Sequence, residues 1–285
     1  MKKIIIAVAM LAGLGLNAAA YFDGGISGTT GPHGYSGTKL DLVIGSGNLA
    51  IEPSMVSYKS NAIDTTRTYG LRGAWEAEKY TIAGLVGTTP EVNRYSNNFF
   101  GGDITFSLTP GSGGHSRLAG PGSRGGARSG EGVTRIDIGA GFKQTLHTQT
   151  QVVGSDLKTS QTEGSLFAGA KVFMLNVSAS YTGYKYSDEK ATPLGFVPGH
   201  NFVLGAFPKS SVNLKLDLPS TLPMLTPFVS YTGTKYKFGT KDSTAYLLGA
   251  YIDLSMVTAN VSYQILDSGA SKNDNFVSVG AGVKF

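Results

Sequence analysis

The sequence has no cysteine, a single tryptophan among 285 residues, and only 15% charged residues. Without cysteine there is no disulfide framework, which excludes the class of small stapled secreted domains. The formal net charge of +5 is too weak to indicate a nucleic-acid-binding surface. After residue 20 no apolar run is long enough to cross a membrane as a helix. The chain is long enough for one large domain, whose stability has to come from its secondary structure.

The first twenty residues have the parts of a secretory signal peptide. Residues 1–3 (MKK) are basic, residues 4–16 are apolar, and the alanines at 18–20 supply an A-x-A cleavage site. The apolar run is shorter than the roughly 20 residues of a membrane-spanning helix, which argues against an anchor. We therefore expect residues 1–20 to be a cleaved signal peptide and the mature chain to begin near Tyr21.

Glycine and aromatic residues are abundant, with 40 glycines, 14 tyrosines and 14 phenylalanines. Apolar residues recur at every second position, and the segments between these runs are rich in Gly, Asn, Asp, Ser and Pro. This pattern is typical of β-strands separated by turns, and no later segment has a convincing helical period. The sequence predicts an all-β protein of about fourteen strands, with twelve and sixteen as alternatives. The predicted strands are residues 20–28, 39–44, 49–58, 66–75, 80–87, 99–108, 133–147, 163–172, 175–186, 202–218, 227–238, 243–254, 257–266 and 276–285.

The alternation is clearest in two of these segments. In residues 133–147, isoleucine and phenylalanine alternate with charged residues and glycine. In residues 276–285 (FVSVGAGVKF), valine and alanine fall on one side of an extended strand and small or polar residues on the other. The chain stops on an aromatic residue, Phe285. Strands of this kind have one apolar face and one polar or small face.

A last strand of this pattern, closed by Phe285 and combined with a signal peptide, resembles the final strand of Gram-negative outer-membrane β-barrels. The resemblance implies that residues 21–285 form a transmembrane, antiparallel, up-and-down barrel of the porin-like kind in the outer membrane. In that class the barrel-assembly machinery recognises the terminal aromatic strand, so Phe285 is the candidate assembly signal. The implied function is a channel for passive diffusion of small hydrophilic solutes or ions. The implied partners are these solutes, outer-membrane lipid and the assembly machinery, without nucleic acid or cofactor, and the class allows a homo-oligomer.

The charged residues opposite the apolar rows would face the inside of such a barrel. About fourteen strands enclose a lumen that side chains alone do not fill, because barrels of about eight strands are just filled. We expect inward charges of both signs to set a transverse field across a wet lumen. The candidate pore-lining residues are Glu52, Arg72, Asp103, Arg135, Asp137, Lys143, Lys171, Lys215, Asp217 and Asp253. Within this set, Arg72, Arg135 and Lys143 are expected to face Asp103, Asp137 and Asp217.

The glycine-rich residues 110–130 (PGSGGHSRLAGPGSRGGARSG) fit this scheme poorly. Counting strands back from the last one places this link in the periplasm, where barrel links are usually short. Its three arginines, Arg117, Arg124 and Arg128, occur without any acid in a run typical of a mobile tether. Either the strand count is wrong by one, or the loop is unusual and stays in the periplasm or folds into the lumen.

No catalytic or metal-binding motif stands out. Glycine patterns at residues 45–50 and 120–125 open no helix, so they do not indicate a dinucleotide site. The four histidines, His33, His115, His147 and His200, have no metal-ligand spacing. We therefore predict neither an enzyme nor a metal protein. Two alternatives to the channel remain: a structural or adhesive barrel that acts through its extracellular loops, and a hydrolase with a rim site near His147 or His200.

Overall fold

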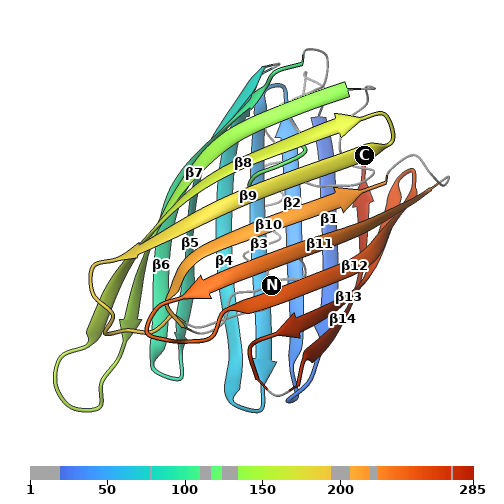
Figure 1. Ribbon diagram of the computed structural model, residues 1–285. Helices are drawn as coiled ribbons and strands as arrows, with labels where there is room; N and C mark the ends of the chain where they lie inside the picture. The colour runs from blue at the N-terminus through green and yellow to red at the C-terminus, as the bar shows by residue number, and fades with distance from the viewer. Residues whose placement is uncertain are drawn as a thin grey trace, which may run out of the picture.

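The computed structural model describes residues 20–77, 79–109, 117–123, 134–193, 206–218, 224–270 and 272–285. They form fourteen β-strands, each paired with two neighbours in a closed antiparallel barrel (Figure 1). The described part of the chain contains no helix long and apolar enough to cross a membrane. The strands are β1 (Ala20–Thr30), β2 (Ser36–Ser46), β3 (Leu49–Ser60), β4 (Ile63–Glu76), β5 (Tyr80–Val92), β6 (Tyr95–Ser107), β7 (Thr134–Gln149), β8 (Leu157–Val172), β9 (Leu175–Tyr186), β10 (Pro208–Asp217), β11 (Leu225–Tyr236), β12 (Ser243–Leu254), β13 (Val257–Asp267) and β14 (Asp274–Lys284).

The prediction of a fourteen-strand antiparallel barrel is confirmed, and each predicted strand has its counterpart. Most strands extend beyond the predicted bounds; β8 begins at Leu157 where residue 163 was expected. In β10 the pairing with β11 shifts register between Pro208 and Ser210, where the proline has no backbone N–H to donate to the ladder. Residues 202–205 of the predicted tenth strand lie outside the described residues.

The two-residue period separates an apolar outside from a polar inside. In β14, Val277 and Val279 are 45% and 60% exposed, whereas Ser278 between them is 6% exposed. In β7, Ile138 is 42% exposed and its neighbour Asp137 is fully buried. Successive side chains of a strand point to opposite faces, so the valines and isoleucines cover the outer wall and the polar residues fill the lumen.

The first and last strands close the barrel against each other. The β1–β14 register places Asp23 opposite Lys284. At the end of this seam the backbone nitrogens of Phe22 and Phe285 each donate to the other residue's carbonyl, at 2.6 and 2.9 Å. Their rings are stacked with centroids 5.1 Å apart. The seam therefore leaves no open strand edge, and the terminal Phe285 is part of the closed sheet.

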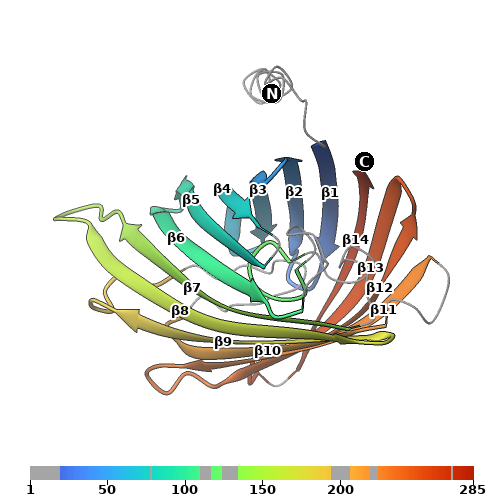
Figure 2. The same ribbon diagram turned by 90° about the horizontal axis from the view of Figure 1, so that it is seen from above.

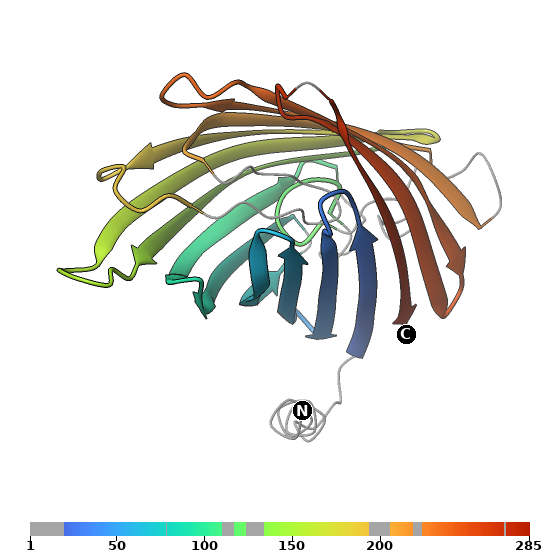
Figure 3. The same cartoon turned by 90° about the horizontal axis from the view of Figure 1, so that it is seen from below.

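The even number of strands brings the start of β1 and the finish of β14 to the same end of the barrel, here called the terminal end (Figures 2 and 3). The opposite end is called the far end. Tight two-residue turns join β2 to β3, β8 to β9 and β12 to β13 at the terminal end. The much longer β6–β7 link, which contains the glycine-rich residues, starts from this same end.

Two small apolar clusters lie inside the barrel among the described residues. One lies near the terminal end under β2 to β5, and the other near the far end where β12, β13 and β14 meet. Between them the inward side chains are mostly hydroxyls, amides and ion pairs. The first cluster is Val43, Ala50, Ala74 and Ala83 with Tyr21, and the second is Ala245, Leu266 and Phe276 with Tyr35.

Candidate functional site

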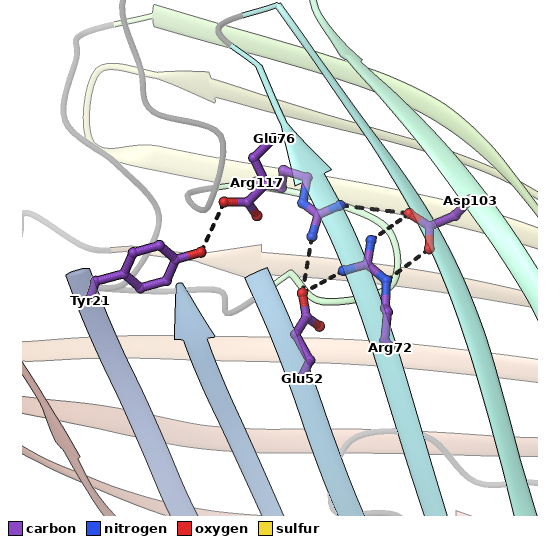
Figure 4. Close-up of polar contacts among 6 residues, drawn as sticks. All are labelled: Tyr21, Glu52, Arg72, Glu76, Asp103 and Arg117. Carbon is purple, nitrogen blue, oxygen red and sulfur yellow. Dashed lines mark hydrogen bonds and ion pairs between the residues drawn. The ribbon is translucent and has the colours of Figure 1, made fainter. Parts of the chain in front are cut away.

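The polar network inside the barrel centres on Arg72 of β4 (Figure 4). Its Nε and Nη2 donate to the two carboxylate oxygens of Asp103 in β6, at 2.9 and 2.7 Å. Its Nη1 donates to Oε1 of Glu52, the residue opposite it in β3, at 2.5 Å. Arg72 and Asp103 are 7% and 6% exposed, and the fork of a guanidinium fits a carboxylate in this two-bond geometry. Two acids around one arginine leave an excess negative charge, which a second cation can balance.

That second cation is Arg117, from the link between β6 and β7. Its Nη2 lies 3.7 Å from Oε1 of Glu52, and its Nη1 lies 3.6 Å from Oδ1 of Asp103. Arg117 is 2% exposed, yet its Nε and Nη1 make no hydrogen bond with the described residues. The two ion pairs are too long to be hydrogen bonds. Arg117 therefore completes the charge balance of the cluster through electrostatic attraction (Figure 4).

A third carboxylate, that of Asp137, holds the same loop. The backbone nitrogen of Leu118 donates to Oδ2 of Asp137 in β7 at 2.9 Å. Oδ1 of Asp137 accepts from the hydroxyl of Ser107 at 2.8 Å and from Nε of Arg135 at 2.9 Å. A carboxylate has about four lone-pair directions, so these wall partners still leave one for the loop. The loop is thus tied to β7 as well as to the cluster around Arg72.

Glycines in the wall make room for the loop. A Cβ atom at Gly169 of β8 would lie 2.6 Å from Cβ of Leu118 and 3.1 Å from Cβ of Ala119. A Cβ atom at Gly139 of β7 would lie 2.3 Å from the ring of Phe167. Leu118 and Ala119 are 6% and 4% exposed. The loop and the Phe167 ring are therefore packed directly on the backbone of the wall, where only glycine leaves enough space.

Residues 117–123 lie inside the ring of strands, where they are drawn in green (Figures 2 and 3). Gly120 and Gly122 have φ angles of +87° and +76°, and the nitrogen of Ser123 donates to the carbonyl of Gly120 at 3.1 Å. This tight turn reverses the loop within the lumen. The strand count was therefore right, and the alternative of a loop folded into the lumen is confirmed for these residues. Residues 110–116 and 124–130, with Arg124 and Arg128, lie outside the described residues.

The remaining predicted pore-lining residues also lie on inward faces. Lys171 of β8 sits beside Arg135 in the β7–β8 pairing. The others form ion pairs with partners on the same strand, on the neighbouring strand, or across one intervening strand. These pairs are Lys143 Nζ with Glu163 Oε1 at 2.7 Å, Lys215 Nζ with Asp217 Oδ1 at 2.8 Å, and Lys284 with Asp253.

Of the three cations expected to face acids, Arg72 and Arg135 contact two of the named acids, and both contacts run along the wall. Arg72 and Asp103 are hydrogen-bonded across one intervening strand, and Arg135 binds Asp137, two residues further along its own strand. Lys143 likewise pairs with a nearby acid. A local partner prevails because leaving a buried charge unpaired costs several kcal/mol, roughly 3–5 for a broken pair. The charges of these pairs therefore cancel over short distances.

Several lumenal charges were not among the predicted pore-lining residues. Oε2 of Glu76 accepts from the hydroxyl of Tyr21 at 2.9 Å beside the Arg72 cluster (Figure 4). Lys39 and Asp41 of β2 form a pair at 3.0 Å. The strand period already placed Lys39 and Asp41 opposite the apolar Leu40, so this signal was in the sequence. No such signal marked Arg117, because loops have no period.

The loop leaves open space on both of its sides. A cavity of about 540 Å³ lies between the loop and the wall formed by β8 to β14 with β1 and β2. A second cavity of about 380 Å³ lies between the loop and β2 to β7. Lys39, Asp41 and Ser123 line both cavities. The loop therefore narrows the lumen without filling it.

No protein-family model and no curated protein matches the chain. Among solved structures, the CymD monoaromatic hydrocarbon channel matches with a TM-score of 0.51 at 12% identity, over 94% of this chain and 89% of CymD. CdiB from Acinetobacter baumannii matches with a TM-score of 0.51 at 8% identity over 93% of this chain, which spans 60% of CdiB's length. The KdgM porin matches with a TM-score of 0.43 at 10% identity, over 92% and 99% of the two chains. The chain has the fold of an outer-membrane β-barrel.

His147, where the alternative hydrolase would have its rim site, is enclosed in the polar wall of the barrel. Its Nδ1 lies 2.6 Å from the hydroxyl of Tyr95, and its Nε2 lies 3.1 Å from Oε1 of Gln161. Nε2 of Gln161 donates to Glu163 at 2.8 Å, so its Oε1 accepts from the histidine and Nδ1 accepts from the tyrosine. Both ring nitrogens are occupied, and a catalytic base needs one nitrogen directed at its nucleophile. Within the described ranges, no group of three or more His, Asp and Glu is placed to hold a metal ion. His115 and His200 lie outside those ranges.

Proposed function

We propose that this protein is an outer-membrane channel through which small hydrophilic solutes or ions diffuse passively, with residues 117–123 forming the constriction. The observation that carries the proposal is the cavity of about 540 Å³ inside a closed fourteen-strand barrel, beside a loop fixed to the inner wall. Hydroxyl and amide side chains of this cavity replace part of a solute's hydration, so a hydrophilic solute crosses without losing all its hydrogen bonds.

The charge pattern supports weak selectivity between ions. Each charged residue in the described lining of the larger cavity has an opposite charge within contact distance. Compensated pairs produce a small net potential along the path, and a channel without an uncompensated ring of one sign discriminates little between cations and anions. The ten predicted pore-lining residues then act mainly by shaping and wetting the lumen.

Export and assembly complete the proposal. The chain is secreted by its signal peptide, residues 1–20, and the assembly machinery recognises the last strand with Phe285. The outward rows of valine, isoleucine and aromatic side chains then face outer-membrane lipid. CymD is a monoaromatic hydrocarbon channel, but hydroxyls, amides and ion pairs in the present lumen favour hydrophilic solutes.

Swelling of proteoliposomes in solutes of increasing size tests the proposal. Refolded barrel, checked for β-structure by circular dichroism, should admit small neutral solutes and exclude larger ones above a sharp limit. A variant in which residues 117–123 are replaced by a short Gly-Ser link should admit larger solutes. Failure of the correctly folded wild-type barrel to admit even the smallest solute would overturn the channel proposal.

A further inference from the structure

The lining of the larger cavity combines polar and apolar parts. Hydroxyl and amide groups project into it from four consecutive strands, β8 to β11. At the β8 end of this row the lining turns apolar, where the loop contributes Leu118, Ala119 and Pro121 next to the ring of Phe167 of β8. The polar groups of this lining on β8 to β11 are Ser165, Ser178, Ser180, Thr182, Asn213, Lys215 and Ser230.

Charges in this cavity are neutralised in place. Its described lining contains four charged residues, Lys39, Asp41, Lys215 and Asp253. Lys39 and Asp41 pair with each other at 3.0 Å, and Asp253 pairs with Lys284. Lys215 binds Asp217 at 2.8 Å and also lies 5.0 Å from the ring centre of Tyr251. A charged solute entering here would lose hydration without gaining an unpaired counter-charge.

Aromatic rings also border the row at its other end, on β11 and β12. Tyr251 lines the cavity and is stacked on Phe228 with ring centroids 4.6 Å apart. Its hydroxyl accepts a hydrogen bond from Nζ of Lys215 at 3.3 Å, which fixes the ring against the wall. The cavity thus combines flat apolar faces with a row of hydroxyls, and each hydroxyl can both donate and accept.

We propose that this cavity is a transient binding site for uncharged polyhydroxylated solutes of monosaccharide to disaccharide size. Such solutes carry hydroxyls for the row on β8 to β11 and C–H faces for the loop and the aromatic rings. A purely apolar solute would leave the hydroxyl row unpaired, and a charged one finds no free partner. The volume of about 540 Å³ is within the range of small-molecule sites, which is roughly 300–1,000 Å³. The inference rests on the proposed channel function and names its solute class.

Single-channel recording in planar bilayers tests the inference, with maltose, gluconate and protonated glucosamine as probes on one side. Maltose should interrupt the ion current with a frequency that saturates as its concentration rises. Gluconate and glucosamine should produce at least tenfold fewer interruptions at equal concentration. The double variant Ser178→Ala with Ser180→Ala should weaken the maltose effect several-fold, because both hydroxyls belong to the polar row. Thr162→Val, on the outward face of β8, is the matched control and should leave the maltose effect unchanged.

The outcomes separate the two proposals. Complete absence of ion steps from the folded barrel would refute the channel itself. Normal ion steps that maltose never interrupts would refute only the saccharide site. Equal or stronger interruption by gluconate or glucosamine would likewise refute it, since the lining would then hold a charge free to bind a charged solute. An unchanged maltose effect in the double serine variant would show that the row on β8 to β11 is not the site.

Discussion

Replacement of Gly169 by alanine should release the loop from its seat on the wall. The added Cβ would lie 2.6 Å from Cβ of Leu118, whereas ordinary carbon contacts are about 3.5–4.0 Å. The loop must therefore move by about 1 Å or leave. Overpacking of this kind costs about 1–3 kcal/mol, which lowers the ratio of seated to released loop by roughly 5- to 150-fold.

Thiol labelling measures this release directly, because the natural chain has no cysteine. The reporter is Ala119→Cys, at a position that is 4% exposed when the loop is seated. Adding Gly169→Ala should raise the labelling rate by a charged, water-soluble thiol reagent and should also raise the channel conductance. The matched control is Gly164→Ala on the same strand, where a Cβ meets nothing within 4 Å. Equal labelling rates in the two alanine variants would refute the seating of the loop on glycine.

Two further substitutions test the polar cluster and the seam. Arg72→Gln removes the buried cation that binds Glu52 and Asp103, so the free energy of unfolding in urea should fall by about 3–5 kcal/mol. Lys39→Gln breaks a pair whose side chains are 32% and 36% exposed, so it should lower the free energy of unfolding by less than about 1 kcal/mol. Similar losses of unfolding free energy in the two variants would contradict the reasoning that the buried ion pairs of Arg72 contribute more than the exposed pair of Lys39. Phe285→Ala should reduce the amount of barrel assembled in cells far more than Phe22→Ala, although both remove the same ring stack; equal reductions would mean that Phe285 acts through packing alone.

The strands and their faces could be predicted because apolar and polar residues alternate along a strand that has one lipid-facing or exposed side and one inward side. In β14 the exposed valines and the buried Ser278 follow the period of two that the sequence displays. The same period places Glu52, Arg72, Asp103, Arg135 and Asp137 on inward faces. What the period could not supply was their pairing, since it depends on register and on which strands are neighbours.

The place of the loop could not be predicted for a related reason. Residues 117–123 carry no acid, so by composition Arg117 is a solubilising charge on a tether. Its partners, Glu52 and Asp103, and the glycine seat at Gly169 lie on three separate strands. Only the closed barrel brings these groups to one point in the lumen. Local sequence contains neither the acids that attract the arginine nor the missing Cβ that admits the loop.

Single-channel conductance of the refolded wild-type protein in a planar bilayer tests the central claim most directly. We expect discrete current steps whose size rises linearly with voltage. The reversal potential in a salt gradient should be near zero, because the lumenal charges are paired. Replacing residues 117–123 by a short link should give larger steps. Absence of steps from a correctly folded barrel would contradict the channel. Steps of unchanged size after loop replacement would contradict the constriction.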